Sequence, residues 1–244
     1  MMAFQKRSFV GKGKVYLGRF QQNNLQRIGN TSKLSLTIDD ESKELADYEN
    51  PGGGIADAIT RIKEVKVSLT LHNLNAANLA IALFGNASSI ASGTITAESH
   101  TAYKGALIRL DKIGASAVVV SNSGATITYV AGSDYQVSGA GILIPDGSSI
   151  ADATTIKVSY AFGLQNMVEA ITATGEEYTL AFDGLNEADS AKPCAVDLWR
   201  VRFSPLKSLD LIDDDFSKIE LEGKLLKDES RPMGTSSYFR YGFI

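Results

Sequence analysis

The sequence predicts a mainly β protein, an antiparallel β-sandwich or barrel with one flanking α-helix and a small inserted β-sandwich domain. Three observations predict this fold class. Several segments alternate between apolar and polar residues with a period of two, as strands with one buried face do. Helical spacing of apolar residues is convincing only at 74–84. Between 88 and 165 only nine of 78 residues are charged, far fewer than in the rest of the chain.

The clearest strands lie in the first part of the chain. Residues 34–39 and 65–72 alternate between apolar and polar side chains, so each is expected to bury one face and expose the other. Further segments with strand-like patterning are 14–20, 177–183, 197–203, 217–227 and 236–243. Within the segment 217–227, Gly223 indicates a bulge or a close approach of another backbone.

One helix is predicted in the first half. Apolar residues of the segment 74–84 recur at the spacing of one helix face. Asn73 is expected to cap its start, because an Asn side-chain oxygen can accept a free amide of the first turn. Gly85 is expected to end it in the left-handed conformation.

The weakly charged segment 88–165 is predicted to be a domain inserted into a discontinuous host domain formed by 1–87 and 166–244. Insertions are tolerated at exposed loop tips, where the two ends of the host chain stay close together. Short β-branched strands separated by turn residues are expected at 106–110, 117–121, 126–130, 142–144 and 155–160. This pattern favours a small Ig-like sandwich, whose strand order the sequence leaves open.

Composition excludes some classes of protein. The chain has 24 basic and 28 acidic residues and is 44% hydrophobic, which excludes wholesale disorder and disfavours a free-standing nucleic-acid binder. The single cysteine, Cys194, cannot form an intrachain disulfide. The N-terminal 20 residues lack the apolar core of a secretory signal, and no run approaches the 18 apolar residues of a membrane span.

The search for catalytic motifs indicates no enzyme. Neither a Gly-x-Ser-x-Gly elbow nor a phosphate-binding loop occurs, and the glycine clusters at 11–13 and 51–54 are typical of turns. His72 is expected to have a surface or capping role, His100 has less support for a function, and Cys194 is expected to be inert. We therefore expect no catalytic residue, no metal site and no cofactor.

Two acidic clusters leave one alternative open. Residues 39–49 contain six acids and residues 213–215 contain three in a row. Calcium prefers several oxygen ligands, so either cluster could hold this ion. Neither has the spacing of an EF-hand, and solvated acidic loops are the preferred interpretation.

The most unusual feature is the connection 39–61 between two strongly patterned strands. Hairpins normally need two to five loop residues, and long structureless connections in a compact domain are usually functional. Because no catalytic group lies here, contact with another subunit is predicted, and a solvent-exposed flexible loop is the alternative. The candidate contact residues are Asp39, Asp40, Glu41, Glu44, Asp47, Tyr48, Glu49, Pro51, Gly52, Gly53 and Gly54.

Taken in order, five segments resemble the tail tube (major tail) proteins of tailed bacteriophages. They are Phe9-Val-Gly-Lys-Gly-Lys-Val-Tyr-Leu17, Ile28-Gly-Asn-Thr-Ser-Lys-Leu-Ser-Leu36, the acidic connection with Pro51-Gly-Gly-Gly54, the strand 65–71 and the helix 74–84. The resemblance covers the outer halves, about two thirds of the chain. Tyr103–Gly105 and the segments 132–137 and 142–145 resemble an added domain that some tail proteins carry.

The resemblance implies a subunit that forms hexameric rings, which stack into a tube that conducts DNA into the host. It implies no catalytic residues. Its expected partners are copies of itself, the tape-measure protein and transiting DNA in the lumen, and the tail terminator and baseplate or tip proteins. The expected location is the virion tail, assembled in the bacterial host cytoplasm. The connection 39–61 then becomes the candidate inter-ring stacking element.

Two further expectations follow from tube geometry. The inserted domain is expected on the outer surface, because copies of it would block the channel. Such a projection would crowd a contractile sheath, which favours a non-contractile tail. The chief alternative is a non-catalytic, β-rich surface or carbohydrate-binding module, disfavoured because the only tryptophan, Trp199, lies in an expected core strand. An enzyme would need a convergent set of acid, base or nucleophile that the sequence does not supply.

Overall fold

The structure, a computed structural model, describes residues 8–244. Residues 1–7, which the sequence analysis assigns to the host domain, lie outside the described residues. The described chain is mainly β, with antiparallel sheets and one α-helix, which confirms the predicted fold class as a sandwich-like β protein. None of its helical segments is long and apolar enough to cross a membrane.

The chain divides into two compact units. Unit 1 consists of the segment that ends at Ala87 together with Val168–Ile244, and unit 2 is the intervening segment Ser88–Met167. The sequence analysis places the ends of the inserted segment at 88 and 165. Each unit has a buried hydrophobic cluster of its own.

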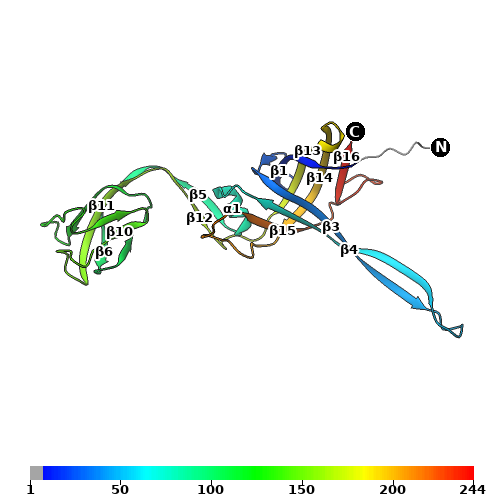
Figure 1. Ribbon diagram of the computed structural model, residues 1–244, viewed down its shortest axis with the longest axis horizontal. Coiled ribbons are helices and arrows are strands. Elements are labelled where there is room, and N and C mark those ends of the chain that lie inside the picture. The colour runs from blue at the N-terminus through cyan, green and yellow to red at the C-terminus, as the bar shows by residue number, and fades with distance from the viewer. Residues whose placement is uncertain (1–7) are drawn as a thin grey trace. The chain divides into compact units, whose positions relative to one another are not determined.

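Eight strands of unit 1 form one antiparallel sheet (Figure 1). They are β1 (Gly11–Arg19), β2 (Gln26–Arg27), β3 (Thr31–Ala46), β4 (Ile55–Leu71), β13 (Glu177–Asn186), β14 (Lys192–Phe203), β15 (Ile219–Leu225) and β16 (Phe239–Phe243). Their order is β2-β1-β13-β14-β15-β4-β3, and β16 also pairs with β14. The sheet branches because β14 pairs with β16 over Cys194–Leu198 and with β15 over Val201–Phe203.

The core of unit 1 is built from strands on both sides of β14. Strand β4 contributes Val65, Val67, Leu69 and Leu71, all at most 2% exposed. Strand β15 contributes every second residue, with Ile219 facing the partner Leu71 across the ladder. Strands β1 and β13, on the other side of β14, and β14 itself add buried residues to the same cluster. The period-two alternation in the sequence is therefore explained by one buried face on each strand.

Gly223 of β15 lies where another backbone passes close by. An added Cβ would stand 2.8 Å from the carbonyl oxygen of Arg202, too close for any side chain. The ladder between β15 and β4 runs without a register shift. Of the two expectations for Gly223, close backbone approach is confirmed, and a bulge between β15 and β4 is not found.

The helix α1 (Ala76–Ala82) lies within the segment where the sequence predicts it, but both predicted ends are wrong. The N-cap is Asn75, whose side chain accepts from the backbone N–H of Asn78. The Asn73 side chain instead accepts from the backbone N–H of Asn30, a tertiary contact. At the other end the left-handed residue is Phe84, with φ of 49°. Gly85 is needed for space, because an added Cβ would meet the Glu169 carbonyl oxygen at 2.3 Å.

Two sheets of three strands each build unit 2. One contains β6 (Gly93–Ala102), β11 (Thr154–Phe162) and β8 (Ser116–Asn122), and the other β7 (Leu107–Arg109), β10 (Gly141–Leu143) and β9 (Gln136–Ser138). The two sheets share a core that includes Val120, Ile142 and Ile156, each 0% exposed. A separate two-stranded ribbon, β5 (Asn86–Ile90) with β12 (Gln165–Glu169), lies where the chain enters and leaves the segment.

Several strand assignments in unit 2 differ from the sequence analysis, which also does not predict the short strand β9. The segment 126–130, predicted as a strand, forms only an isolated bridge between Thr128 and Ser121. Conversely, β6 is a strand of ten residues that the sequence analysis does not predict. Its residues are small and polar, and only Ala102 at its end is fully buried, so no apolar alternation reveals it.

Candidate functional site

The connection predicted as a loop at 39–61 is a β-hairpin, and the prediction of a structureless segment is wrong. Strands β3 and β4 pair from Thr31 opposite Leu71 out to Ala46 opposite Ile55. Only residues 47–54 connect them. In Figure 1 the hairpin reaches past the other strands of unit 1. The sequence hides this pairing because it shows no one-sided alternation of apolar residues beyond Ile38.

The far part of this hairpin lies outside the core. Strand β15 accompanies β4 only from Leu71 to Val65, and no described strand lies beside β3 or β4 further out. Residues 40–46 and 55–63 are all exposed. We call residues 40–63 the outer hairpin. Both of its faces are therefore open to solvent in the described chain.

Cross-strand partners identify what each face of the outer hairpin carries, because directly opposed residues share a face. One face, which we call the Lys43 face, carries the opposed pairs Glu41 and Arg61, Lys43 and Ile59, and Leu45 and Asp57. The other, the Glu44 face, carries the pairs Asp40 and Ile62, Ser42 and Thr60, and Glu44 and Ala58. Both faces mix charge with exposed apolar side chains: Leu45, Ile59 and Ile62 are each more than half exposed.

The turn of the hairpin is held by Asp47. Its carboxylate accepts from the backbone N–H of Glu49 at 2.8 Å and from the Asn50 side-chain Nδ2 at 2.8 Å. The Asn50 side chain is the main cause that lowers the pKa of Asp47 below its usual value. After Pro51 the three glycines 52–54 all adopt positive φ, a conformation that side chains disfavour. Tyr48, 85% exposed, projects from this turn.

A cluster of ion pairs fixes the root of the hairpin. Lys66 Nζ lies 2.6 Å from Asp39 Oδ2 and 2.9 Å from Glu64 Oε1. Lys224 of β15 reaches the other Glu64 oxygen at 2.5 Å. Hydrogen bonds from Lys224 and then Lys66 lower the pKa of Glu64 to about 2. The cluster links β3, β4 and β15 at the point where the outer hairpin begins.

The Glu64 cluster predicts a pH dependence of stability. Because the folded-state pKa of Glu64 lies below its unfolded value of about 4.3, its stabilising effect is present above that value and is lost as pH falls toward about 2. We expect Glu64→Gln to reduce the loss of stability in this range, measured as urea midpoints at several pH values. The control is Glu44→Gln, because Glu44 makes no ion pair among the described residues. Parallel Glu64→Gln and wild-type profiles would contradict the assignment.

The acidic candidates do not converge on one point. Asp40 and Glu44 lie on one face of the outer hairpin, and Glu41 lies on the other. Asp39 is paired with Lys66, and Asp47 is occupied within the turn. Within residues 8–244 no three His, Cys, Asp or Glu side chains are grouped so that they could hold a metal ion.

The other residues singled out by the sequence take part in local contacts. His72 is hydrogen-bonded to Ser32 across β3 and β4, with 2.9 Å between Nε2 and Oγ. His100 Nε2 lies 2.7 Å from the Glu98 carboxylate, which also accepts from the Tyr160 hydroxyl at 2.6 Å. Cys194 is buried in β14, and burial raises the pKa of its thiol.

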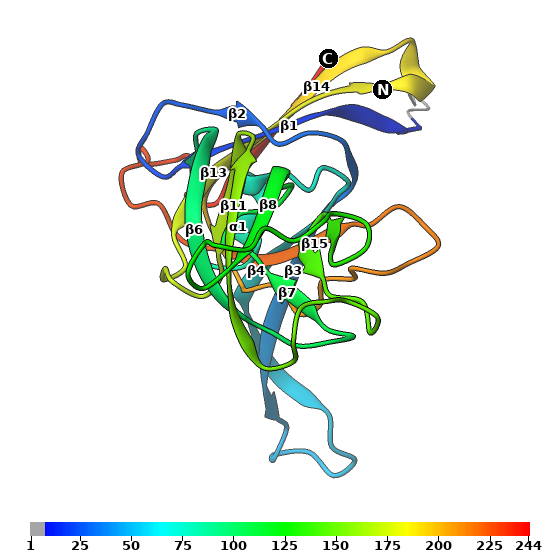
Figure 2. The same ribbon diagram turned by 90° about the vertical axis from the view of Figure 1, so that its left-hand side faces the viewer.

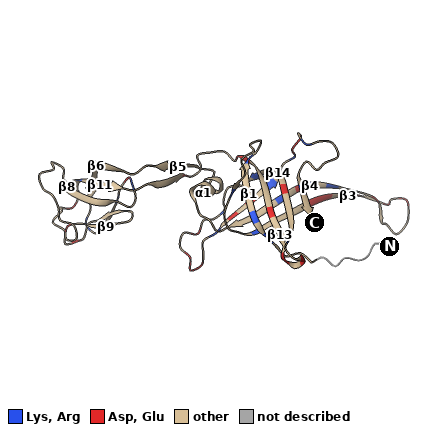
Figure 3. Ribbon diagram, turned by 90° about the horizontal axis from the view of Figure 1, so that it is seen from above, with Lys and Arg blue, Asp and Glu red and all other residues tan. Residues whose placement is uncertain are grey.

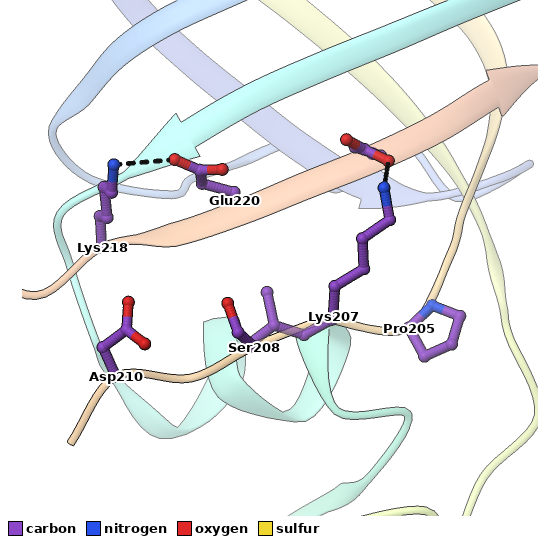
Figure 4. A pocket seen from close by; sticks show the side chains of 8 residues that line it. Pro205, Lys207, Ser208, Asp210, Lys218 and Glu220 are labelled. Carbon is purple, nitrogen blue, oxygen red and sulfur yellow. Dashed lines mark hydrogen bonds and ion pairs between the residues drawn. The ribbon is translucent and has the colours of Figure 1, made fainter.

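A shallow pocket lies beside the start of β15 (Figure 4). Its lining consists of Pro205, Leu206, Lys207, Ser208, Asp210, Lys218, Glu220 and Glu222. Lys207 is paired with Glu222, and Lys218 Nζ lies 2.9 Å from Glu220. Both lysines are therefore occupied by carboxylates of β15. Ser208 also lines the pocket, and within residues 8–244 no hydrogen bond joins its hydroxyl to an acid or a base.

A second exposed apolar surface was missed by the sequence analysis. We call residues 209–216, between β14 and β15, the Leu211 loop. Leu211 is 82% exposed, Ile212 97% and Phe216 88%. Figure 2 shows this segment in orange, projecting beside β15. In the sequence, the signal of exposure is that Leu211, Ile212 and Phe216 are interleaved with acids and follow neither a helical nor a strand period.

Comparisons with known proteins identify one family. No curated protein matches the chain. The profile of a family described as "Protein of unknown function UCP028589" matches residues 8–242. The match spans both parts of unit 1 and the whole of unit 2. The chain therefore belongs to the family of unknown function UCP028589.

Proposed function

We propose that this chain is the structural subunit of a bacteriophage tail tube, in which hexameric rings of copies stack into a tube that conducts DNA into the host. The ordered resemblance of its outer halves to tail tube proteins suggests the class of assembly. The observation that carries the proposal is the outer hairpin, a two-stranded ribbon with exposed apolar residues and no covering element in the described chain. We propose no catalytic role.

Such a ribbon is expected to need a further layer for its stability. A two-stranded hairpin is at best marginally stable in water, and packing against a further layer is what stabilises it. The outer hairpin lacks that layer while exposing Leu45, Ile59 and Ile62. Contact with another copy would bury apolar side chains of this kind and supply the layer that stabilises the hairpin. The candidate stacking residues 39–54 all lie on its strand β3 or in its turn.

Sheet edges offer a second kind of contact. The path of the large sheet ends at β2 and at β3, so the edge of β3, 16 residues long, has no described neighbour. Open edges invite pairing with another chain. In a ring each protomer pairs its edge with the next protomer. When the rotation between neighbours closes the ring, no edge is left open. Ring closure would then use the edge of β3 between Thr31 and Asp39, and stacking would use the outer hairpin.

In the proposed tube, charge, the place of unit 2 and the partner proteins are expected as follows. A net charge of −4 fits a channel through which DNA passes without binding, since like charges repel phosphates. Charged residues colour both the hairpin and the strands β1, β13 and β14 in Figure 3. Unit 2 would lie on the outer surface of a non-contractile virion tail. The tape-measure protein, tail terminator and baseplate or tip proteins are the proposed partners.

One observation bears on the carbohydrate-binding alternative. Sugar platforms need an open aromatic face, but the guanidinium of Arg231 lies 3.7 Å from the ring centroid of Trp199. Arg240 lies 5.4 Å from the same centroid. The indole Nε1–H also donates to the backbone carbonyl of Ser236 at 3.0 Å. Trp199 is therefore occupied within its own unit, which disfavours a glycan site on it.

The proposal predicts self-assembly of purified protein. With increasing concentration we expect sedimentation velocity to show large species, and negative-stain electron microscopy to show rings or tubes with a central channel. Glycan binding is not expected. A protein that stays monomeric at every concentration and is absent from phage particles would overturn the proposal. Monomers that bind defined glycans would instead favour the surface-module alternative.

A further inference from the structure

The Leu211 loop and the outer hairpin lie at opposite ends of the same strand pair. Strand β15 begins with Ile219 opposite Leu71 and ends with Leu225 opposite Val65. The outer hairpin continues β4 beyond Val65, whereas the Leu211 loop enters β15 just before Ile219. One copy therefore presents these two surfaces at opposite ends, as a contact between successive copies requires.

The Leu211 loop exposes more apolar surface than a solvated loop explains. Leu211, Ile212 and Phe216 are each more than four-fifths exposed, and they fall within six residues. Exposed apolar groups gathered in one place mark interaction surfaces. The Lys43 face of the outer hairpin offers matching apolar side chains in Leu45 and Ile59.

The charges of the two surfaces select one face of the hairpin. Acids flank the apolar residues of the Leu211 loop, and none of them makes an ion pair among the described residues; they are Asp210, Asp213, Asp214 and Asp215. The Lys43 face carries Lys43 and Arg61, which also lack ion pairs there, although Glu41 and Asp57 balance the net charge of the face. The Glu44 face carries Asp40 and Glu44 without a base, and repels an acidic loop.

We infer that the Leu211 loop of one copy receives the Lys43 face of the outer hairpin of the next copy, an inference that rests on the proposed self-assembly. Leu211, Ile212 and Phe216 pack against Leu45 and Ile59, while Asp213–Asp215 meet Lys43 and Arg61. The contact is heterologous, because different surfaces of the two copies meet. Repeated without closure, such a contact builds a filament.

A charge exchange between the two surfaces tests this contact. Lys43→Glu/Arg61→Glu on the hairpin and Asp213→Lys/Asp214→Lys on the loop should each raise the protein concentration needed for assembly by roughly tenfold or more. Both pairs of substitutions in one chain should restore assembly, because the charges are again opposite. The matched control is Ser42→Glu/Thr60→Glu, which adds two acids to the Glu44 face and should leave assembly near the wild-type level. Thermal melts confirm that each variant is folded.

The outcomes separate this inference from the proposed function. If the wild type assembles and the folded loop variant assembles equally well, the inference fails and the proposed function stands. If the charge-exchanged chain needs as high a concentration for assembly as the two variants with one altered surface, the pairing of these two surfaces is wrong. If the wild type never self-associates, the proposed function and the inference both fail. Loss in each parent together with recovery in the combined variant supports the inference.

Discussion

Removing the outer hairpin is expected to abolish the stacking of rings into tubes while leaving unit 1 folded. Residues 41–61 can be replaced by Asn-Gly, because Asp40 and Ile62 are opposed across the ladder and a two-residue turn joins opposed strands. The removed residues contact no core cluster of unit 1. We therefore expect an essentially unchanged thermal transition, and rings that no longer stack into tubes by sedimentation velocity and electron microscopy.

The matched control keeps the hairpin and alters only its tip. Pro51→Ala leaves both strands and their exposed apolar faces in place, so it should preserve assembly. If the shortened chain still builds tubes of normal appearance, the outer hairpin is not the stacking element. A shortened chain that does not fold would contradict the independence of the outer hairpin from the core.

Because the two units have separate cores, a cavity made in one core is expected to destabilise that unit alone. Leu198 is 0% exposed in the core of unit 1, and Ile156 is 0% exposed in the core of unit 2. Truncating a buried Leu or Ile to Ala costs about 2–5 kcal/mol through lost burial and the cavity left behind. We expect Leu198→Ala to lower the thermal transition of unit 1 alone, and Ile156→Ala that of unit 2 alone.

Calorimetry measures the two transitions, and hydrogen exchange assigns each of them to a unit. Glu220→Ala is the control for unit 1, since Glu220 alternates with buried residues of β15 on its exposed face. It should shift neither transition by more than a small amount. Equal shifts of both transitions by either core substitution would show that the units unfold together.

The parts of the fold that follow from the sequence are those where burial is one-sided. In residues 65–71 of β4 and in β15 the inward residues are apolar, apart from Gly223, and the outward residues are polar or charged, so the alternation reports the core directly. The outer hairpin gives no such signal, because neither of its faces is buried in the chain itself. How far β3 and β4 stay paired depends on the cross-strand register, which cannot be read from a single sequence.

Other differences arise from tertiary contacts. Asn73 and Asn75 are both chemically able to cap α1, and the choice is made by Asn30, which donates its backbone N–H to Asn73. Gly85 is explained by the approach of Glu169, distant in sequence. The candidate contact residues 39–54 lie in strand β3 and the turn of the hairpin, where the sequence predicts a loop. The Leu211 loop was missed because its apolar residues have no secondary-structure period to reveal them.

The division of the chain has a consequence for biosynthesis. Unit 2 is continuous, so its core is complete once Phe162 has left the ribosome. Unit 1 must wait, because β1 pairs with β13 and β4 pairs with β15, whose last residue is Leu225. Nascent chains at 5–20 residues per second therefore carry an unfinished first half for several seconds. During that interval unit 2 lies between the two parts of unit 1 in the sequence, and we expect the acids and lysines of β3 to disfavour pairing of its open edge with neighbouring nascent chains.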